Sequence, residues 1–187
     1  MRAATETAMD ADPLEARAAA EPRPTSVEDV VTGLRETLGE DWPPRIYRER
    51  ILSTRTRAHS VPAAPRNVRV EVQHTLLGIE LKVGRRRVSC PDLATARYLS
   101  VFARAGVTQV AVPYDITKIS RLADELESAW QRLLLLADHQ TRSRAVTFRT
   151  RVRTAALKEV KREIEEAGAG TAIPQFNQNT RQRPQRI

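Results

Sequence analysis

The sequence contains few of the residues that build redox, metal or stacking sites. Cysteine occurs once, at Cys90, which excludes a disulfide within the chain and a zinc site with several cysteine ligands. Aromatic residues make up only 4% of the chain, so aliphatic side chains must form the core, and we expect no large aromatic ligand pocket. The three histidines lie far apart in the sequence and predict no metal site, and we expect no cofactor.

Long apolar segments are also missing. No run approaches the roughly 20 apolar residues that span a bilayer. Residues 1–25 lack the apolar centre of a secretory signal. We therefore expect a cytoplasmic protein with no membrane partner. A glycine-rich phosphate loop is absent as well, so the sequence does not predict nucleotide hydrolysis.

Charged residues are unevenly distributed along the chain, whose formal net charge is +8. Residues 1–44 contain 4 basic and 10 acidic residues, residues 45–67 contain 6 and 1, and residues 141–187 contain 11 and 4. Only four of the 31 basic residues are lysine, so the planar, bidentate guanidinium group dominates. Two basic segments on either side of a nearly neutral centre favour nucleic acid or another polyanion as the partner.

Composition and apolar periodicity divide the chain into four segments. Residues 1–25 have no apolar period and predict a disordered acidic leader. Residues 26–66 predict a short helix, which starts at a capping box of Ser26 and Asp29, and then a basic linker that contains prolines. Residues 67–168 predict the core, and residues 169–187 predict a basic flexible tail.

The core is predicted to be α+β, with a small antiparallel sheet of three to four strands, a packed helix and a long C-terminal helical hairpin. Apolar residues alternate in the segments VRVEVQ and IELKV, which indicate two strands. The segment VGRRRVSC indicates a turn at Gly84 into a third short strand that ends at Cys90, and VTQVAVP indicates a fourth. Ser89 and Asp92 predict the start of the helix between the third and fourth strands. Apolar stripes predict helices over about 117–138 and 141–167, packed on the sheet or on a second subunit.

Two groups of basic residues are candidate phosphate contacts. One surrounds the turn at Gly84, and the other occupies the first half of the last predicted helix, where no acidic residue occurs between Thr141 and Leu157. The second half of that helix, with Glu159, Glu163, Glu165 and Glu166, is typical of a solvated helix. The predicted nucleic-acid-binding residues are Lys82, Arg85, Arg86, Arg87, Arg142, Arg144, Arg149, Arg151 and Arg153.

These patterns favour a non-enzymatic protein that binds DNA or RNA, or that acts as a nucleoprotein adaptor. The long helices would allow a homo-oligomer. An alternative is a scaffold protein that docks its basic residues on an acidic protein partner.

The order α-β-β-β-α-β, together with the segment IELK, resembles the core of the PD-(D/E)xK nuclease superfamily over roughly residues 27–112. The resemblance implies a Mg²⁺-dependent nuclease in which Glu80 binds the metal, Lys82 is the catalytic lysine, and Glu71 replaces the usual aspartate. Glu36 would add a fourth group. A turn centred on Thr75 would place Glu71 opposite Glu80 on one polar face. The Pro-Asp pair of the family is absent here.

Overall fold

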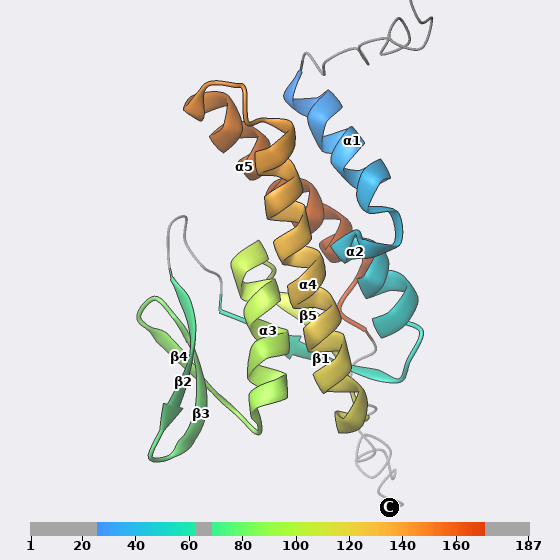
Figure 1. Ribbon diagram of the computed structural model, residues 1–187. Coiled ribbons are helices and arrows are strands. Elements are labelled where there is room, and N and C mark those ends of the chain that lie inside the picture. The colour runs from blue at the N-terminus through green and yellow to red at the C-terminus, as the bar shows by residue number, and fades with distance from the viewer. Residues whose placement is uncertain (1–25, 63–68, 171–187) are drawn as a thin grey trace, which may run out of the picture.

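The structure is a computed structural model that describes residues 26–62 and 69–170. It has the predicted α+β architecture, with two small antiparallel sheets and a long C-terminal helical hairpin (Figure 1). The expected leader, residues 1–25, and the expected tail beyond Gly170 lie outside the described residues. Among the helices that are described, none combines the length and the apolar character needed to cross a membrane.

Helical segments dominate the fold, and they are α1 (Val27–Leu38), the 3-10 turn η2 (Gly39–Asp41), α2 (Pro43–Ile46), the π-helical turn η3 (Tyr47–Ile51), α3 (Leu93–Ala105), α4 (Ile116–Gln140) and α5 (Val146–Ala167). The strands are short, and they are β1 (Thr56–Ser60), β2 (Val70–Thr75), β3 (Gly78–Val83), β4 (Arg86–Cys90) and β5 (Gln109–Pro113).

Helix α1 begins with the capping box that the sequence predicts. The hydroxyl of Ser26 accepts from the N–H of Asp29, and the N–H of Ser26 donates to the Asp29 carboxylate, both at 3.0 Å. Helix α3 begins differently, so the predicted cap at Ser89 is wrong. Asp92 is the N-cap and accepts from the N–H of Thr95 at 2.7 Å, whereas Ser89 still belongs to strand β4.

Strands β2, β3 and β4 form an antiparallel meander, as predicted. The loop between β2 and β3 is Leu76–Leu77, with Thr75 paired to Gly78, so the turn lies one residue later than the turn predicted at Thr75. The Thr75 hydroxyl accepts from the N–H of Leu77 at 3.3 Å and donates to the carbonyl of Gly78 at 3.1 Å. Gly78 has a φ of +125°, which favours glycine, and these contacts together set the position of the loop.

The shifted turn changes the partners of the two strand glutamates. Glu71 pairs with Lys82, while Glu80 lies between Gln73 on β2 and Ser89 on β4. The predicted direct pairing of Glu71 with Glu80 is therefore wrong. Because side chains alternate along a strand, both carboxylates still lie on the same face of the meander.

The other face of the meander packs on α3. Leu81, Val83 and Cys90 are buried there. Burial raises the pKa of the Cys90 thiol, so the side chain stays protonated and acts as a small apolar group. The meander is therefore a one-sided sheet, apolar toward α3 and polar on its open face.

Strand β5 does not join the meander but pairs with β1 in a separate two-stranded sheet. Thr56 lies opposite Pro113 and Ser60 lies opposite Gln109. Strand β1 falls inside the segment predicted as a basic linker, and the sequence analysis does not predict a strand at residues 56–60. The segment TRAHS lacks apolar alternation, since Thr56 is its one buried residue, and only pairing with β5 makes it a strand.

Two buried tyrosines occupy the other edge of β5 in place of a third strand. The N–H of Ala111 donates to the Tyr47 hydroxyl at 2.9 Å, and its carbonyl accepts from the Tyr98 hydroxyl at 2.6 Å. Tyr47 in turn donates to the carbonyl of Gly168 at 2.7 Å, which connects η3 and β5 to the chain after α5. Burial raises the pKa of both tyrosines, so both hydroxyls remain protonated donors.

The helical hairpin of α4 and α5 packs on α1 and α3 of the same chain. The apolar stripe of α4 is buried in this way, without a second subunit. Its buried residues are Ile119, Leu122, Ala123, Leu126, Ala129, Trp130, Leu133 and Ala137.

A buried carboxylate joins α5 to the N-terminal helices. Glu163 is only 5% exposed, accepts from Trp42 Nε1 at 3.0 Å, and pairs with Arg35 at 3.4 Å and with Arg48. The expectation of a solvated second half of the last helix is therefore wrong at Glu163. Its oxygens are satisfied by one neutral and two cationic donors, which is the condition for burying a carboxylate.

Replacing Glu163 with alanine is expected to lower the free energy of unfolding by about 2 to 3 kcal/mol. The indole N–H of Trp42 loses its acceptor, whereas Arg35 and Arg48 are half exposed and regain water. Urea unfolding measures this loss. The control Glu165→Ala removes an exposed carboxylate of the same helix and should cost less than about 0.5 kcal/mol. Equal losses in the two variants would contradict the role of Glu163.

Replacing Tyr47 with phenylalanine is expected to lower the free energy of unfolding by about 2 kcal/mol, because it leaves the N–H of Ala111 and the carbonyl of Gly168 without partners. Tyr98→Phe should cost about half as much, since it leaves only one carbonyl unpaired. Thermal or urea unfolding compares the two variants. The bridging role of Tyr47 is wrong if Tyr98→Phe proves the more damaging change.

Candidate functional site

The first predicted basic group lies at the turn between β3 and β4. Arg85, Arg86 and Arg87 are all exposed. Arg87 pairs with Glu80 at 3.4 Å, and Lys82 pairs with Glu71 at 3.8 Å. Within the described residues, Arg85 and Arg86 have no carboxylate partner and are the two cations of this turn that remain available to a ligand.

The second predicted basic group lies where α4 turns into α5. Arg144 stacks over the ring of Phe148, 5.4 Å from its centroid, and Arg153 pairs with Asp138 of α4 through a bond of 2.8 Å from Nε. The remaining three arginines have no carboxylate partner in the part of the chain that the structure describes. They are Arg142, Arg149 and Arg151. The cause is local, because α5 carries no acidic residue within one turn of Arg149 or Arg151.

The end of α4 and the start of α5 enclose a groove of about 600 Å³, which we call the arginine groove. Its lining residues are Leu135, Asp138, His139, Arg142, Val146, Arg149, Thr150 and Arg153. Three of them are arginines and one is an acid. Leu135 is 69% exposed and Val146 is 66% exposed, so apolar side chains lie between the guanidinium groups. The groove therefore combines positive charge with exposed aliphatic surface.

Sequence reasoning identified the arginines of this groove but not its α4 wall. Leu135, Asp138, His139 and Arg142 follow one another at the spacing i, i+3, i+4 and i+7. The residues from Val146 to Arg153 that line the groove repeat the same spacing. Such spacing places residues on one helical face. The same spacing occurs on both sides of the short connection between the two helices, and this repeat could have predicted the groove from the sequence.

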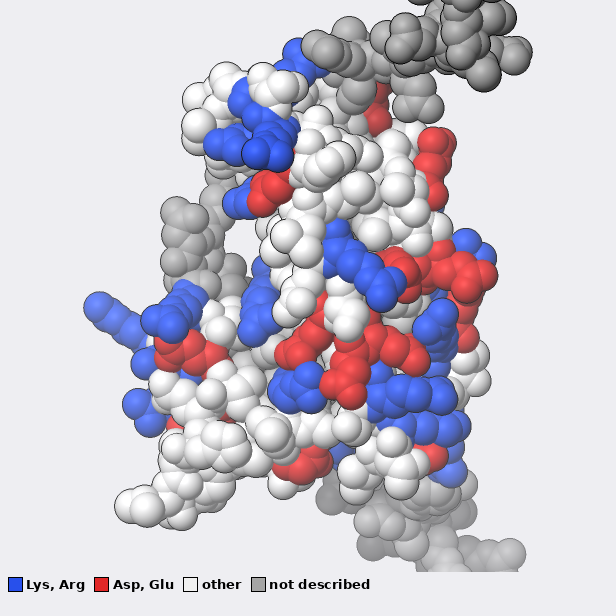
Figure 2. Space-filling model, in the orientation of Figure 1, with Lys and Arg blue, Asp and Glu red and all other residues white. Residues whose placement is uncertain are grey.

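The two basic groups do not form one continuous patch on the visible face of the molecule. Figure 1 shows the β3–β4 turn and the start of α5 on the same side of the view but well separated. In Figure 2, the blue atoms of the meander and those at the α4–α5 turn form two separate groups. A ligand that contacts both groups must therefore be extended.

The structure places Glu71, Glu80 and Lys82 on one face of the meander, but their charges are paired with one another and with arginines. Glu71 accepts from Gln73 at 2.9 Å and pairs with Arg69 at 2.8 Å, in addition to Lys82. Glu36 lies on α1, and β5 belongs to the other sheet. Among the described residues, no group of three or more His, Cys, Asp or Glu side chains is arranged to hold a metal ion. Each strand carboxylate instead has a cation as its partner.

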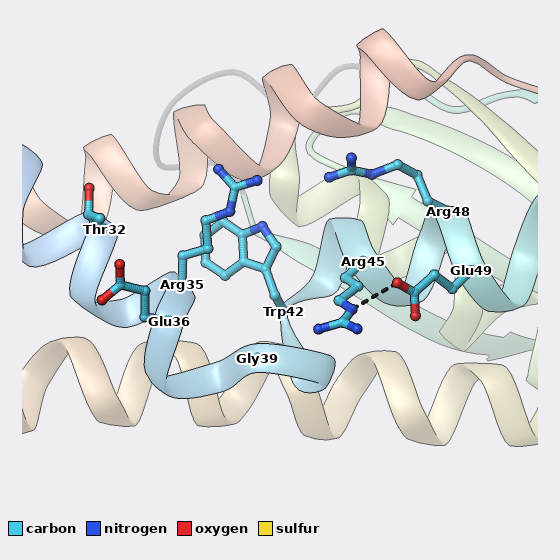
Figure 3. A pocket seen from close by; sticks show the side chains of 8 residues that line it. All are labelled: Thr32, Arg35, Glu36, Gly39, Trp42, Arg45, Arg48 and Glu49. Carbon is cyan, nitrogen blue, oxygen red and sulfur yellow. Dashed lines mark hydrogen bonds and ion pairs between the residues drawn. The ribbon is translucent and has the colours of Figure 1, made fainter.

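A second cavity, of about 780 Å³, lies beside Trp42 and also contains arginines (Figure 3). Its three guanidinium groups are already paired. Arg35 and Arg48 contact Glu163, and Arg45 donates to Glu49 at 2.8 Å. This hydrogen bond raises the pKa of Arg45. The cavity is therefore balanced in charge, in contrast to the arginine groove.

We expect Mg²⁺ and Mn²⁺ to shift the thermal unfolding midpoint of the native chain no more than that of a Glu71→Gln/Glu80→Gln double variant. Both carboxylates are paired with cations, and a metal ion that bound them would stabilise the folded state. Differential scanning fluorimetry with each metal makes the comparison. Stabilisation by a metal ion in the native chain but not in the double variant would support the nuclease interpretation.

No family model matches the chain, and no curated protein or solved structure matches it either.

Proposed function

We propose that the protein binds nucleic acid without acting on it chemically, as a nucleic-acid-binding or nucleoprotein-adaptor protein of the cytoplasm. The observation that supports this proposal is that Arg142 and Arg149 line the arginine groove, with Arg151 nearby on α5, and that none of the three has a carboxylate partner in the described chain. Guanidinium groups that form no ion pair within the protein are available to pair with a ligand. Phosphate groups match the planar donor geometry of arginine.

Binding of this kind draws its free energy from the release of counterions from the phosphate backbone. It depends on the number of cations in contact and little on the base sequence. Arg85 and Arg86 provide a second contact point at the β3–β4 turn, which an extended strand can reach together with the groove. We therefore expect weak sequence preference and a steep dependence of affinity on salt.

The first test compares two pairs of arginine substitutions. Arg142→Gln/Arg149→Gln should weaken binding to a labelled oligonucleotide of about 20 nucleotides and reduce the slope of log K against log salt by about 1.5 to 2. The control pair, Arg121→Gln/Arg132→Gln, removes the same charge from arginines already paired with Glu125 and Asp41. Fluorescence anisotropy from about 50 to 200 mM salt measures both slopes.

The control pair should leave the salt slope close to that of the native chain. If the native chain retains no oligonucleotide even at low salt, the proposal is wrong, and docking on an acidic protein becomes the interpretation to pursue. If the two pairs weaken binding equally, net charge and not the arginine groove is responsible.

A second test removes a negative charge from the groove instead of a positive one. Asp138→Asn should release Arg153 into the groove and tighten oligonucleotide binding by about threefold, because the one acidic group of the groove is lost. The matched control is Asp124→Asn, which removes an exposed carboxylate that pairs with Arg97. Anisotropy at constant salt compares the two. An equal gain in both variants would argue against a specific role for Asp138.

A further inference from the structure

The arginine groove has a property that phosphate binding does not explain. Leu135 and Val146 are each about two-thirds exposed between its guanidinium groups. A phosphate backbone offers charge and sugar but little that would cover two aliphatic side chains. The groove therefore fits a ligand that alternates negative charge with aliphatic groups, in the way an acidic peptide does.

The chain itself contains such a peptide. Residues 3–16 have the sequence AATETAMDADPLEA, with four acidic residues and no basic residue. Met9 and Leu14 are the two large apolar residues in this segment, and they flank Asp10 and Asp12. The segment thus complements the groove in charge and in apolar character.

The start of α1 is at the correct end of the molecule for this contact. Figure 1 shows the first turn of α1 and the α4–α5 turn at the same end of the helical bundle. Residues 17–25 connect the segment to Ser26. Nine residues reach at most about 30 Å, which is more than twice the diameter of a helix with its side chains. A connection of this length can cross two neighbouring helices at that end of the bundle.

We infer that residues 3–16 occupy the arginine groove in the absence of nucleic acid and compete with nucleic acid for it. A segment tethered by a short connection has an effective concentration of about 1 mM, so even weak binding fills the groove for much of the time. Nucleic acid must displace the segment, so the apparent affinity for nucleic acid is the intrinsic affinity multiplied by the fraction of chains whose groove is empty. The competition rests on the proposed function, whereas occupancy of the groove does not.

The test uses the full chain with two carboxylates neutralised. Asp10→Asn/Asp12→Asn should raise the affinity for the oligonucleotide about threefold to tenfold, since the segment binds the groove less well. The control Glu36→Gln/Glu40→Gln removes the same charge from exposed positions in the last turn of α1 and in η2. In a chain that also carries Arg142→Gln/Arg149→Gln, the gain from the Asp10 and Asp12 changes should disappear, because the groove no longer holds the segment.

A second measurement, made without nucleic acid, separates this inference from the proposed function. In the Asp10→Asn/Asp12→Asn chain, backbone amide resonances of residues 135–153 should shift relative to the native chain, and the control pair should leave them unchanged. These shifts in a chain that retains no oligonucleotide would support the inference and refute the proposed function. Oligonucleotide binding without any shift in residues 135–153 would overturn the inference and leave the proposed function in place.

The basic tail offers a competing location for the acidic segment. Residues 171–187 contain three arginines and no acidic residue. Amide shifts confined to the tail would show that the segment binds there and would overturn the assignment to the groove.

Discussion

The burial of Glu163 is the constraint on which the arrangement of the helices depends. A carboxylate that loses its water costs several kcal/mol unless donors replace that water. Trp42, Arg35 and Arg48 supply the donors, and they come from the loop after α1, from α1 and from η3. The Glu163 carboxylate therefore keeps all of these donors only if α5 lies against all three segments at once. The carboxylate thus fixes the second half of α5 to the N-terminal part of the chain.

This anchor divides α5 into two halves with different electrostatic roles. The acidic residues of the helix all lie in its second half and are used in pairs within the chain. Its first half has no acidic residue, and among the residues that the structure describes, Asp138 of α4 is the only carboxylate that pairs with an arginine of that half, Arg153. One helix therefore serves the fold at one end and offers cations to a ligand at the other.

The β1–β5 pair shows the same dependence on distant partners. Tyr47 and Tyr98 bond to the backbone N–H and carbonyl of Ala111 at the outer edge of β5. Gly170 lies close to Thr56, and a Cβ atom added to Gly170 would be 2.4 Å from the hydroxyl oxygen of Thr56. The chain after α5 therefore passes directly over the small sheet, and only a residue without a side chain fits. The tyrosine hydroxyls therefore take the backbone groups of β5 that a third strand would use, and β5 lies in a sheet separate from the meander.

The sequence by itself determined the features that arise from interactions within a few residues. The capping box at Ser26, the alternation in β2 and β3, the apolar stripe of α4 and the absence of acid in the first half of α5 are all local, and each was predicted. Only the tertiary structure decided the partner of β5, the burial of Glu163 and the position of the α4 wall of the groove. Glu163 is separated in the sequence from Trp42 by 121 residues and from Arg48 by 115, and no local sequence pattern predicts contacts at such separations. Which arginines remain without an internal partner was decided in the same way, because each pairing depends on carboxylates that the fold brings from other elements.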